Sequence, residues 1–398
     1  MNPNPDVQPV PETASRPASA PLAGCRIAIP SNLAVRGWPM EAGSRALEGY
    51  VATEDAFVVE QLRLQGAELT EGLSVAELGF GLDGGTAGMA VREEADASLV
   101  ADAFGECRLL AMANGLAGFK PTQGLVSRRG LAGLIPSMEC MSVTARDLSR
   151  LSQIVGAIAV TDDLDPSMRQ EVPPGSVSGG PVSTAFRTIG VVQEAVALLS
   201  ETEQNRFRRQ MERAAARGLD VREISIPEFS LIRKAHQVIG AVEASSSTGR
   251  YDGVRFGHRA TGASNWNDMY LQTRAESFGT RLKSFLFQGA CFQFKEFEAH
   301  QDAGRIRRRL LEAVESLFRQ VDVLALPVRR PAADPVRART VRQVYDAFEM
   351  TLPASLLGLP AAVFPGPEKP AADDPGLQWV APALRDGDLL SFGAFLAG

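Results

Sequence analysis

The chain has 398 residues, 45% of them hydrophobic, which is enough to bury the core of one large domain or two modest ones. Its net charge of −6 at pH 7 leaves no overall basic surface and argues against direct binding of nucleic acid. No apolar run approaches the roughly 18 residues that a membrane-spanning helix requires, so no membrane association is expected.

The cysteines and the N-terminus indicate where the protein works. Its four cysteines lie far apart without a CxxC pair, which argues against a disulfide framework and against a zinc site. We therefore expect reduced thiols, a cytoplasmic protein and no metal or other cofactor. Residues 1–23 are rich in Pro, Ala and Ser and lack the apolar run of a signal peptide, so a disordered tail is predicted ahead of one domain at 24–398.

The first predicted elements are a strand and a helix. Cys25–Ile29 has the residue types of a short strand. The next pattern predicts a helix over residues 54–65, with Thr53 as its N-cap and Gly66 just past its end. Glycines then crowd between residues 80 and 130, as expected where the chain needs positive φ or close backbone approach.

The second half of the chain alternates helices and strands. A helix is predicted from Asp147 to about Ala159, and residues 170–184 form a linker or surface loop within the domain. A strand–helix–strand unit follows over residues 188–226, and a basic helix at 304–320 leads into a strand at 321–326. The helix of that unit should bury one apolar face, made by Phe207, Met211 and Ala214.

Three long motifs carry a family resemblance. Gly118–Ser127 resembles the G-(L/F)-K-P-T-x-G-x-V-S segment of the amidase signature family, and Leu352–Ala361 resembles its V-P-A-N-L-A-G-L-P-A segment. Glu243–His258, with Arg274–Gly279 after it, is similar to the A subunits of glutamyl-tRNA amidotransferase in that family. The resemblance covers about residues 25–395. It implies an α/β fold in which one large mixed sheet is covered by helices on both faces.

The resemblance also identifies the positions of the family's catalytic lysine, cis-peptide serine and nucleophilic serine. The lysine position is Pro30, in the segment Ile27–Asn32. Counting back from Lys120 without a gap puts Glu106 at the nucleophile position and Leu82 at the cis-serine position. These three residues supply neither a base nor a hydroxyl nucleophile, so the resemblance implies an amidase frame without amidase chemistry.

Two further differences from the family surround these positions. The long segment that lines the family's substrate pocket is reduced here to the dozen residues between Gly66 and Gly81. We expect this shortening to expose apolar side chains that a partner would cover, namely Leu78, Phe80 and Leu82. Residues 86–98 resemble the family's next helix but carry several charges, so an exposed helix is predicted. The Gly81–Leu82 peptide is predicted to be trans.

Other roles for the residues near position 106 remain open. Cys107 could attack an amide with help from a histidine, although a small buried thiol is the favoured interpretation, because His236, His258 and His300 lie outside the matched catalytic segments. Glu106 could instead lie against the old oxyanion-hole amides and plug the site. Three acidic residues could gather around a hard cation, namely Asp83, Asp102 and Glu106. Acids of this kind more commonly lie in solvated loops.

Four residues are candidates for ligand binding by resemblance: Tyr251, Asp252, Arg255 and Arg307. The alternative is that Asp252 and Arg255 only tie down a loop. The resemblance thus implies a catalytically degenerate relative of the amidotransferase A subunits that binds a partner or a ligand. Candidate partners are a small amide or carboxylate, a second copy, and an amidotransferase-like subunit. The alternatives are an active amide hydrolase with a rebuilt site, or a decayed copy with little function.

Overall fold

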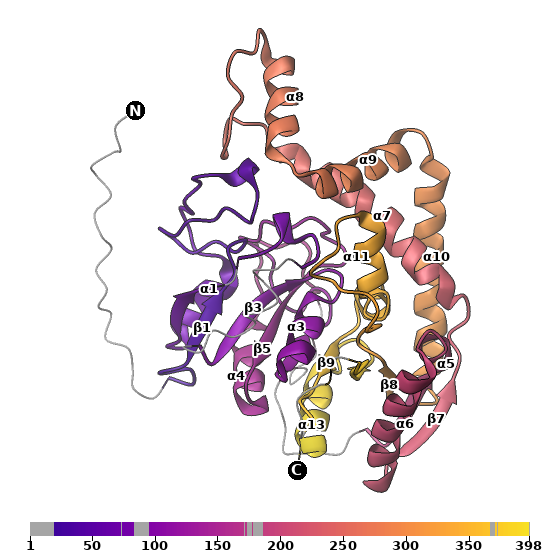
Figure 1. Cartoon of the computed structure of the whole chain (residues 1–398). Helices are drawn as coiled ribbons and strands as arrows, with labels where there is room; N and C mark the ends of the chain where they lie inside the picture. The colour runs from indigo at the N-terminus through magenta and orange to yellow at the C-terminus, as the bar shows by residue number, and fades with distance from the viewer. Residues whose placement is uncertain are drawn as a thin grey trace.

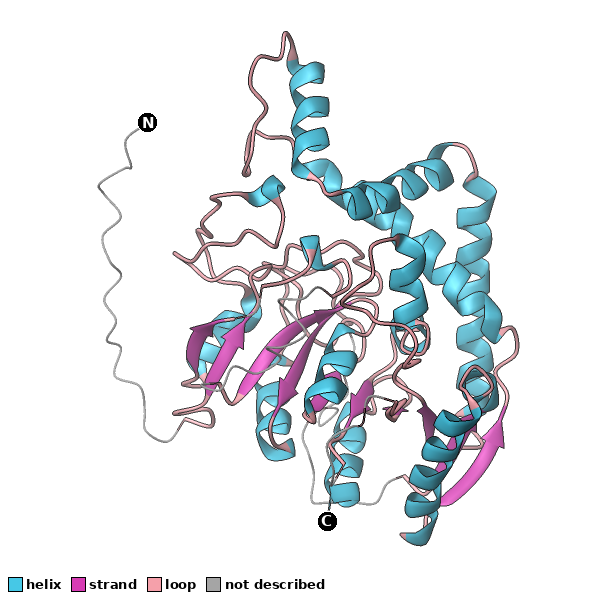
Figure 2. Cartoon of the chain, in the orientation of Figure 1, coloured by secondary structure: helices cyan, strands magenta, loops and turns pink. Residues whose placement is uncertain are grey.

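A single mixed β-sheet forms the centre of the molecule. The computed structural model describes residues 20–72, 74–82, 95–170, 172, 177, 186–366, 371 and 373–397. Its strands lie in the order β2-β1-β3-β5-β4-β9-β10-β8-β6-β7 (Figure 1 and Figure 2). In chain order their bounds are β1 Arg26–Ile29, β2 Glu68–Glu71, β3 Ala97–Asp102, β4 Ala117–Lys120, β5 Cys140–Ala145, β6 Thr188–Val192, β7 Asp220–Ile224, β8 Val323–Leu326, β9 Ala361–Val363 and β10 Gln378–Val380.

The sheet has an antiparallel centre between two parallel flanks. β1 pairs parallel with β2 and β3, and β6 pairs parallel with β7 and β8. From β3 through β5, β4, β9 and β10 to β8, every pair is antiparallel. All residues of β4, β5 and β8 are buried, which means that both faces of the central sheet are covered. The predicted α/β fold with one large mixed sheet is confirmed.

Helices cover this sheet and form a second body beside it. α3 packs on β3, β4, β5 and β9, and α4 packs on β4 and β5. α7, α9 and α10 pack on one another, and α8 projects away from the rest of the chain (Figure 1). The described α-helices are α1 Phe57–Leu64, α3 Glu106–Asn114, α4 Leu148–Ile158, α5 Gln193–Val196, α6 Glu201–Ala216, α7 Ile232–Ser247, α8 Trp266–Ser277, α9 Thr280–Phe294, α10 Phe297–Leu317, α11 Val341–Phe348, α12 Leu352–Leu356 and α13 Asp386–Ala397. None of these helices is both long enough and apolar enough to cross a membrane.

Several predicted elements are confirmed. β1 occupies the first predicted strand, and α4 begins after Asp147, whose side chain accepts the Arg150 N–H at 2.7 Å. β6, α6 and β7 form the predicted strand–helix–strand unit, with the expected apolar face of α6 buried. The basic helix is longer than predicted, because α10 already begins at Phe297.

The start of α1 differs from the prediction. Its N-cap residue is Ala56, and no side chain caps the helix. The Thr53 carbonyl accepts a hydrogen bond from Arg36 Nε at 3.0 Å, and the Ala56 N–H donates to the Ala34 carbonyl at 2.8 Å. These tertiary contacts hold the chain outside the helix through Ala56, so they outweigh the local preference of Thr53 for a cap. Gly66 follows the helix with a φ of +82°, as predicted.

The short segment before residue 82 is covered, which contradicts the prediction that its apolar side chains are exposed. Leu78, Phe80 and Leu82 are all buried. The Phe80 ring stacks on Phe285 of α9 with 4.5 Å between ring centroids. Arg281 of the same helix donates to the Phe80 carbonyl at 3.1 Å. Helix α9 therefore fills the side on which we expected a partner to bind.

Some predictions fall on residues that the structure does not describe. Residues 1–19 of the predicted tail lie outside the described ranges, whereas Leu22, which the prediction also assigned to the tail, is fully buried. Most of the predicted loop at 170–184 and most of the predicted helix at 86–98 also lie outside them. Of that helix, residues 95–98 are described, and Ala97 and Ser98 belong to strand β3. The Gly81–Leu82 peptide is trans, as predicted.

Candidate functional site

The fold brings the three predicted catalytic positions to one small cavity. Pro30 follows β1, Leu82 ends the covered short segment, and Glu106 is the first residue of α3. The cavity holds about 20 Å³, which is room for one or two water-sized molecules. Its described lining is mostly apolar and consists of Pro30, Asn32, Val75, Ala76, Gly79, Gly81, Leu82, Leu99, Val100, Ala101, Glu106 and Leu110.

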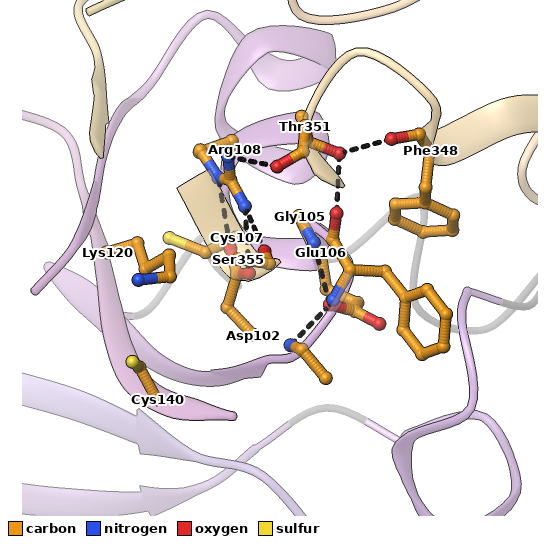
Figure 3. Close-up of polar contacts among 12 residues, drawn as sticks. Asp102, Gly105, Glu106, Cys107, Arg108, Lys120, Cys140, Phe348, Thr351 and Ser355 are labelled. Atoms are coloured by element: carbon orange, nitrogen blue, oxygen red, sulfur yellow. Dashed lines mark hydrogen bonds and ion pairs between the residues drawn. The ribbon is translucent and has the colours of Figure 1, made fainter. Parts of the chain in front are cut away.

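The Glu106 carboxyl group is held by three consecutive backbone amides. Its Oε2 accepts N–H hydrogen bonds from Ala103 and Phe104 at 2.9 Å each and from Gly105 at 3.1 Å (Figure 3). Gly105 makes this turn possible with a φ of +129°, and a Cβ at this residue would lie 2.1 Å from Thr351 Oγ1. Successive N–H groups that point at one oxygen form an anion-binding nest. The N–H groups of the turn between β3 and α3 therefore bind the side chain of Glu106, the residue that follows the turn.

The polar atoms that face the cavity are left without partners. Glu106 Oε1 is buried and has no hydrogen-bond partner, and the same holds for both side-chain polar atoms of Asn32. Burial, and then the nearby Asp102 carboxylate, raise the pKa of Glu106 to about 8, although its three N–H donors oppose this shift. Near neutral pH this carboxyl group is therefore mostly protonated.

Arg108 lies on the other side of Glu106 and connects four segments. Its fully buried guanidinium donates to Asp102 Oδ1 at 3.1 Å and to Ser355 Oγ at 2.8 Å. It also donates to the Thr351 carbonyl at 2.9 Å (Figure 3). A further hydrogen bond runs to Gln378 Oε1 at 2.9 Å. A buried arginine with this many partners fixes the end of β3 and the start of α3 relative to α12 and β10.

Cys107 faces away from the cavity. Its Sγ lies 3.3 Å from the Val143 carbonyl oxygen of β5, and the residue is fully buried. Burial, with a further contribution from Asp102, raises the pKa of the thiol well above its ordinary value. A thiol in these surroundings is a poor nucleophile, which agrees with the favoured prediction of a small buried cysteine.

His236 contacts the turn between β3 and α3, a contact that the sequence did not predict. Its Nε2 lies 3.0 Å from the Ala103 carbonyl, and its Nδ1 lies 3.1 Å from the Tyr345 hydroxyl. Because a carbonyl only accepts, Nε2 carries the proton, and Nδ1 accepts from Tyr345. Burial lowers the pKa of His236 to about 4, so the imidazole is neutral. Ala103 lies 133 residues away, and no local pattern around His236 indicates this contact.

The four predicted ligand residues do not line this cavity. Tyr251 is buried under the guanidinium of Arg250, whose Cζ lies 5.1 Å from the ring centroid. Asp252 Oδ1 accepts the Val254 N–H at 2.9 Å, and its Oδ2 lies 3.7 Å from Arg255 Nε in the same loop. These contacts are those expected if the pair ties down the loop.

Arg307 binds a backbone segment near α7. It donates to the Ser137 hydroxyl and to the Ser137 carbonyl, both at 2.9 Å, and the Ser137 N–H donates to Glu243 of α7 at 2.9 Å. Burial lowers the pKa of Arg307, but it remains a cation. Its contacts are those of a structural residue, and its role toward a ligand stays a prediction.

The residues considered for a metal do not form a site in the described chain. Asp83 lies outside the described ranges, and Asp102 is paired with Arg108. No group of three His, Cys, Asp or Glu side chains able to hold a metal ion occurs among the described residues.

Comparison with known proteins identifies the family. The amidase family model matches residues 10–89 and 81–390 of this chain. The chain belongs to the amidase family. It is 31% identical to the A subunit of glutamyl-tRNA(Gln) amidotransferase from Natronomonas pharaonis, over 97% of this chain and 98% of that protein. It is 32% identical to the corresponding A subunit from Thermus thermophilus, over 93% of this chain and 83% of that one.

Solved structures of the same family share the fold. The A subunit of glutamyl-tRNA(Gln) amidotransferase from Thermotoga maritima matches with a TM-score of 0.72 and 21% identity, over 93% of this chain and 82% of that chain. A peptide amidase from Stenotrophomonas maltophilia matches with a TM-score of 0.76 and 20% identity, over 95% and 82%. The predicted resemblance to the amidase family and its A subunits is confirmed.

Proposed function

We propose that this amidase-family protein has lost serine-type amide hydrolysis and acts by binding a small ligand and a partner subunit. The observation that carries the proposal is the Glu106 carboxyl group, at the predicted nucleophile position, with its Oε2 on three consecutive backbone N–H groups. Enzymes that transfer acyl groups use such N–H groups to stabilise the oxyanion of the tetrahedral intermediate. Here a carboxyl oxygen already occupies them, so a substrate carbonyl would have to displace it.

The described lining of the cavity supports the loss of the other catalytic groups. Pro30 cannot move a proton, and Leu82 cannot relay one. The polar side chains in the described lining are Asn32 and Glu106. A nucleophilic serine needs an adjacent base to be activated, and neither a serine nor a strong base belongs to this lining.

The size and polarity of the cavity limit what it can bind. A space of about 20 Å³ admits a water-sized group and excludes a whole glutamine side chain. The Asn32 amide offers a donor and an acceptor, and protonated Glu106 offers a donor through Oε1. A very small amide or carboxylic acid group complements these atoms. The homologous proteins are by name subunits of an amidotransferase, which supports a partner subunit for this chain in the cytoplasm.

One observation favours the alternative function, an amide hydrolase with a rebuilt site. A carboxyl group with a pKa of about 8 and one unpartnered oxygen has the properties of a general base that works near neutral pH. In that case Glu106 would activate a water molecule in the cavity, with Asn32 orienting it.

Hydrolysis assays separate the two functions. We expect purified protein to release no ammonia from glutamine, asparagine or simple aryl amides above a buffer blank. Turnover that Glu106→Ala or Cys107→Ala abolishes, and that the exposed Glu212→Ala retains, would replace the proposal with the hydrolase. Ligand binding is tested with formamide and formate: the thermal midpoint of wild type should rise, and that of Asn32→Leu should not.

A further inference from the structure

The three N–H groups that bind Glu106 belong to three consecutive peptide units, and each unit also carries a carbonyl group. These peptides are trans, so the N–H and the C=O of each unit point in opposite directions. The carbonyls concerned are those of Asp102, Ala103 and Phe104. A group that binds one of these carbonyls therefore fixes the direction of the N–H on the same unit.

The Phe104 carbonyl is bound by the hydroxyl group of Thr351. The two oxygens lie 2.5 Å apart, which requires the hydroxyl proton to lie between them. The same Oγ1 lies 2.9 Å from the Phe348 carbonyl, a longer and weaker contact (Figure 3). Thr351 is fully buried and directly precedes α12. Its hydroxyl thus holds the peptide unit that carries the Gly105 N–H.

The Ala103 carbonyl is bound by His236 of α7. Its oxygen accepts the Nε2–H of the fully buried imidazole at 3.0 Å, and the Tyr345 hydroxyl fixes that tautomer by donating to Nδ1 at 3.1 Å. This unit carries the Phe104 N–H. The remaining unit begins at Asp102, the last residue of β3 to pair with β5. The sheet, α7 and the segment before α12 therefore each hold one unit.

These contacts affect how the three N–H groups bind Glu106. An amide whose carbonyl accepts a hydrogen bond is polarised and donates more strongly through its N–H. With Oε2 fixed on the three N–H groups, Oε1 is left at the cavity, where it has no hydrogen-bond partner. The carbonyl contacts thus determine which oxygen of Glu106 a bound molecule meets.

We infer that Thr351 and His236 are positioning residues of the cavity, which hold the carbonyls behind the three N–H groups and so fix Glu106 with Oε1 toward the cavity. Neither residue belongs to the described lining of the cavity, so each acts through Glu106. For a bound ligand, which would meet Oε1, the inference rests on the proposed function. The orientation and protonation of Glu106 can be measured without a ligand.

The test follows the protonation of Glu106 by infrared spectroscopy from pH 5 to 9. A protonated carboxyl group has its own C=O band, and the band that Glu106→Gln loses is that of Glu106. In wild type it should disappear with a midpoint at about pH 8. Neighbouring groups keep their charge over this range, because Asp102 is paired with Arg108. Burial lowers the pKa of His236 to about 4 and raises the pKa of Tyr345 well above its ordinary value, so both stay neutral.

Two pairs of variants separate the hydrogen bonds from the bulk of the side chains. Thr351→Val removes the hydroxyl at nearly constant shape, and Thr351→Ser keeps it. His236→Leu removes the Nε2–H, and His236→Gln keeps an N–H in its place. Weaker N–H donors stabilise the carboxylate less, so the Glu106 midpoint should rise by about half a unit to one unit in Thr351→Val and in His236→Leu. Thr351→Ser and His236→Gln should keep the wild-type midpoint.

Thr248→Val is the matched control. It removes a fully buried hydroxyl that donates to the Ala244 carbonyl at 2.9 Å, and it should leave the Glu106 midpoint unchanged. A midpoint that is unchanged or lowered in both Thr351→Val and His236→Leu would overturn the inference. So would a rise in Thr351→Ser equal to that in Thr351→Val. Circular dichroism checks the fold, and if either variant fails to fold, the other decides.

Formamide links the inference to the proposed function. It should raise the thermal midpoint of Thr351→Ser as much as that of wild type, and that of Thr351→Val less. If formamide leaves wild type unchanged, the proposed ligand binding fails, and the infrared midpoints still decide whether Thr351 and His236 position Glu106.

Discussion

At the N-terminus of α3, two opposing effects act on the Glu106 carboxyl group. Three N–H donors and the start of a helix stabilise a negative charge. Complete burial and the neighbouring Asp102 oppose that charge and prevail, since they raise the pKa to about 8. A buried acid that keeps its proton is therefore the main titratable feature of the cavity.

This pKa shift predicts how the stability of the fold depends on pH. The unfolded chain loses the Glu106 proton near pH 4.5, whereas the folded chain keeps it until about pH 8. The native state thus binds more protons in this window, so the free energy of unfolding should fall as pH rises through it, by a few kcal/mol at about 1.4 kcal/mol per pKa unit.

Denaturant midpoints from pH 4 to 9 test this expectation. Glu106→Gln should flatten the profile, whereas the exposed Glu212→Gln should keep the slope of wild type. If Glu106→Gln follows the wild-type profile, the carboxyl group titrates normally and the hydrogen bonds from the three amides outweigh burial.

Gly105 provides a second prediction at the residue scale. An alanine Cβ at this residue would lie 2.3 Å from Thr351 Cβ, in addition to straining a backbone with φ of +129°. We expect Gly105→Ala to lower the free energy of unfolding by about 3 kcal/mol or more, which combines backbone strain with overpacking.

Gly218→Ala is the matched control for Gly105→Ala. Its φ is +83°, and nothing lies within 4 Å of the added Cβ. It should therefore cost only the backbone strain, about 1–2 kcal/mol. Equal losses for the two variants, measured by urea denaturation, would show that the contact with Thr351 relaxes without cost.

At the scale of elements, the motifs that carry the family resemblance hold the frame together. The buried Lys120 of β4 donates to the Leu359 carbonyl at 2.9 Å, and β4 pairs with β9 just beyond it. Thr122 donates to Asp386 of α13 at 2.5 Å, and burial raises the pKa of this aspartate to about 6. These contacts give Lys120 and Thr122 a structural role.

The buried hydrogen bonds of Arg108 give a prediction about how the elements are joined. Arg108→Ala should destabilise the fold by about 3–5 kcal/mol, because it leaves Asp102 buried without its partner. The double variant Arg108→Met with Asp102→Leu should recover part of that loss, since it removes both charges.

Chemical denaturation of both Arg108 variants, with Arg308→Ala as control, measures the effect. Arg308 pairs with Glu312 on the exposed face of α10, and its loss should cost no more than about 0.5 kcal/mol. If Arg108→Ala loses as little as the control, Asp102 is satisfied without the arginine.

At the scale of the whole molecule, the cavity decides whether catalysis can be restored. The triple variant Pro30→Lys, Leu82→Ser, Glu106→Ser returns the family's three residue types. We expect it to gain little amidase activity, because the cavity at these three positions has space only for a water-sized group. Glutaminase and aryl-amidase assays of this variant measure the outcome.

A second variant makes that result interpretable. Glu106→Ser alone should fail as well, since a hydroxyl without a base is a weak nucleophile. A large gain in the triple variant, absent from Glu106→Ser, would show that the pocket can still admit an amide and that only the three side chains block hydrolysis.

The sequence by itself determined the family, the fold class and most of the regular elements. Long motifs such as Gly118–Ser127 retain their residue order. Strong local patterns identified α4 within one or two residues and the buried face of α6. These features depend on nearby residues, because caps, apolar periodicity and turn glycines act within a few positions of the chain. The register of the motifs was also enough to select Pro30, Leu82 and Glu106 together.

Only the tertiary structure decided what surrounds those residues. The cover that α9 provides over Phe80, the late start of α1 at Phe57, and the contact of His236 with Ala103 all join segments distant in the chain. Tertiary structure also brings Asn32, whose side-chain polar atoms have no hydrogen-bond partner, to the same cavity as Glu106. Burial and unsatisfied hydrogen bonds are properties of packing, and no local pattern encodes which distant element fills a given space.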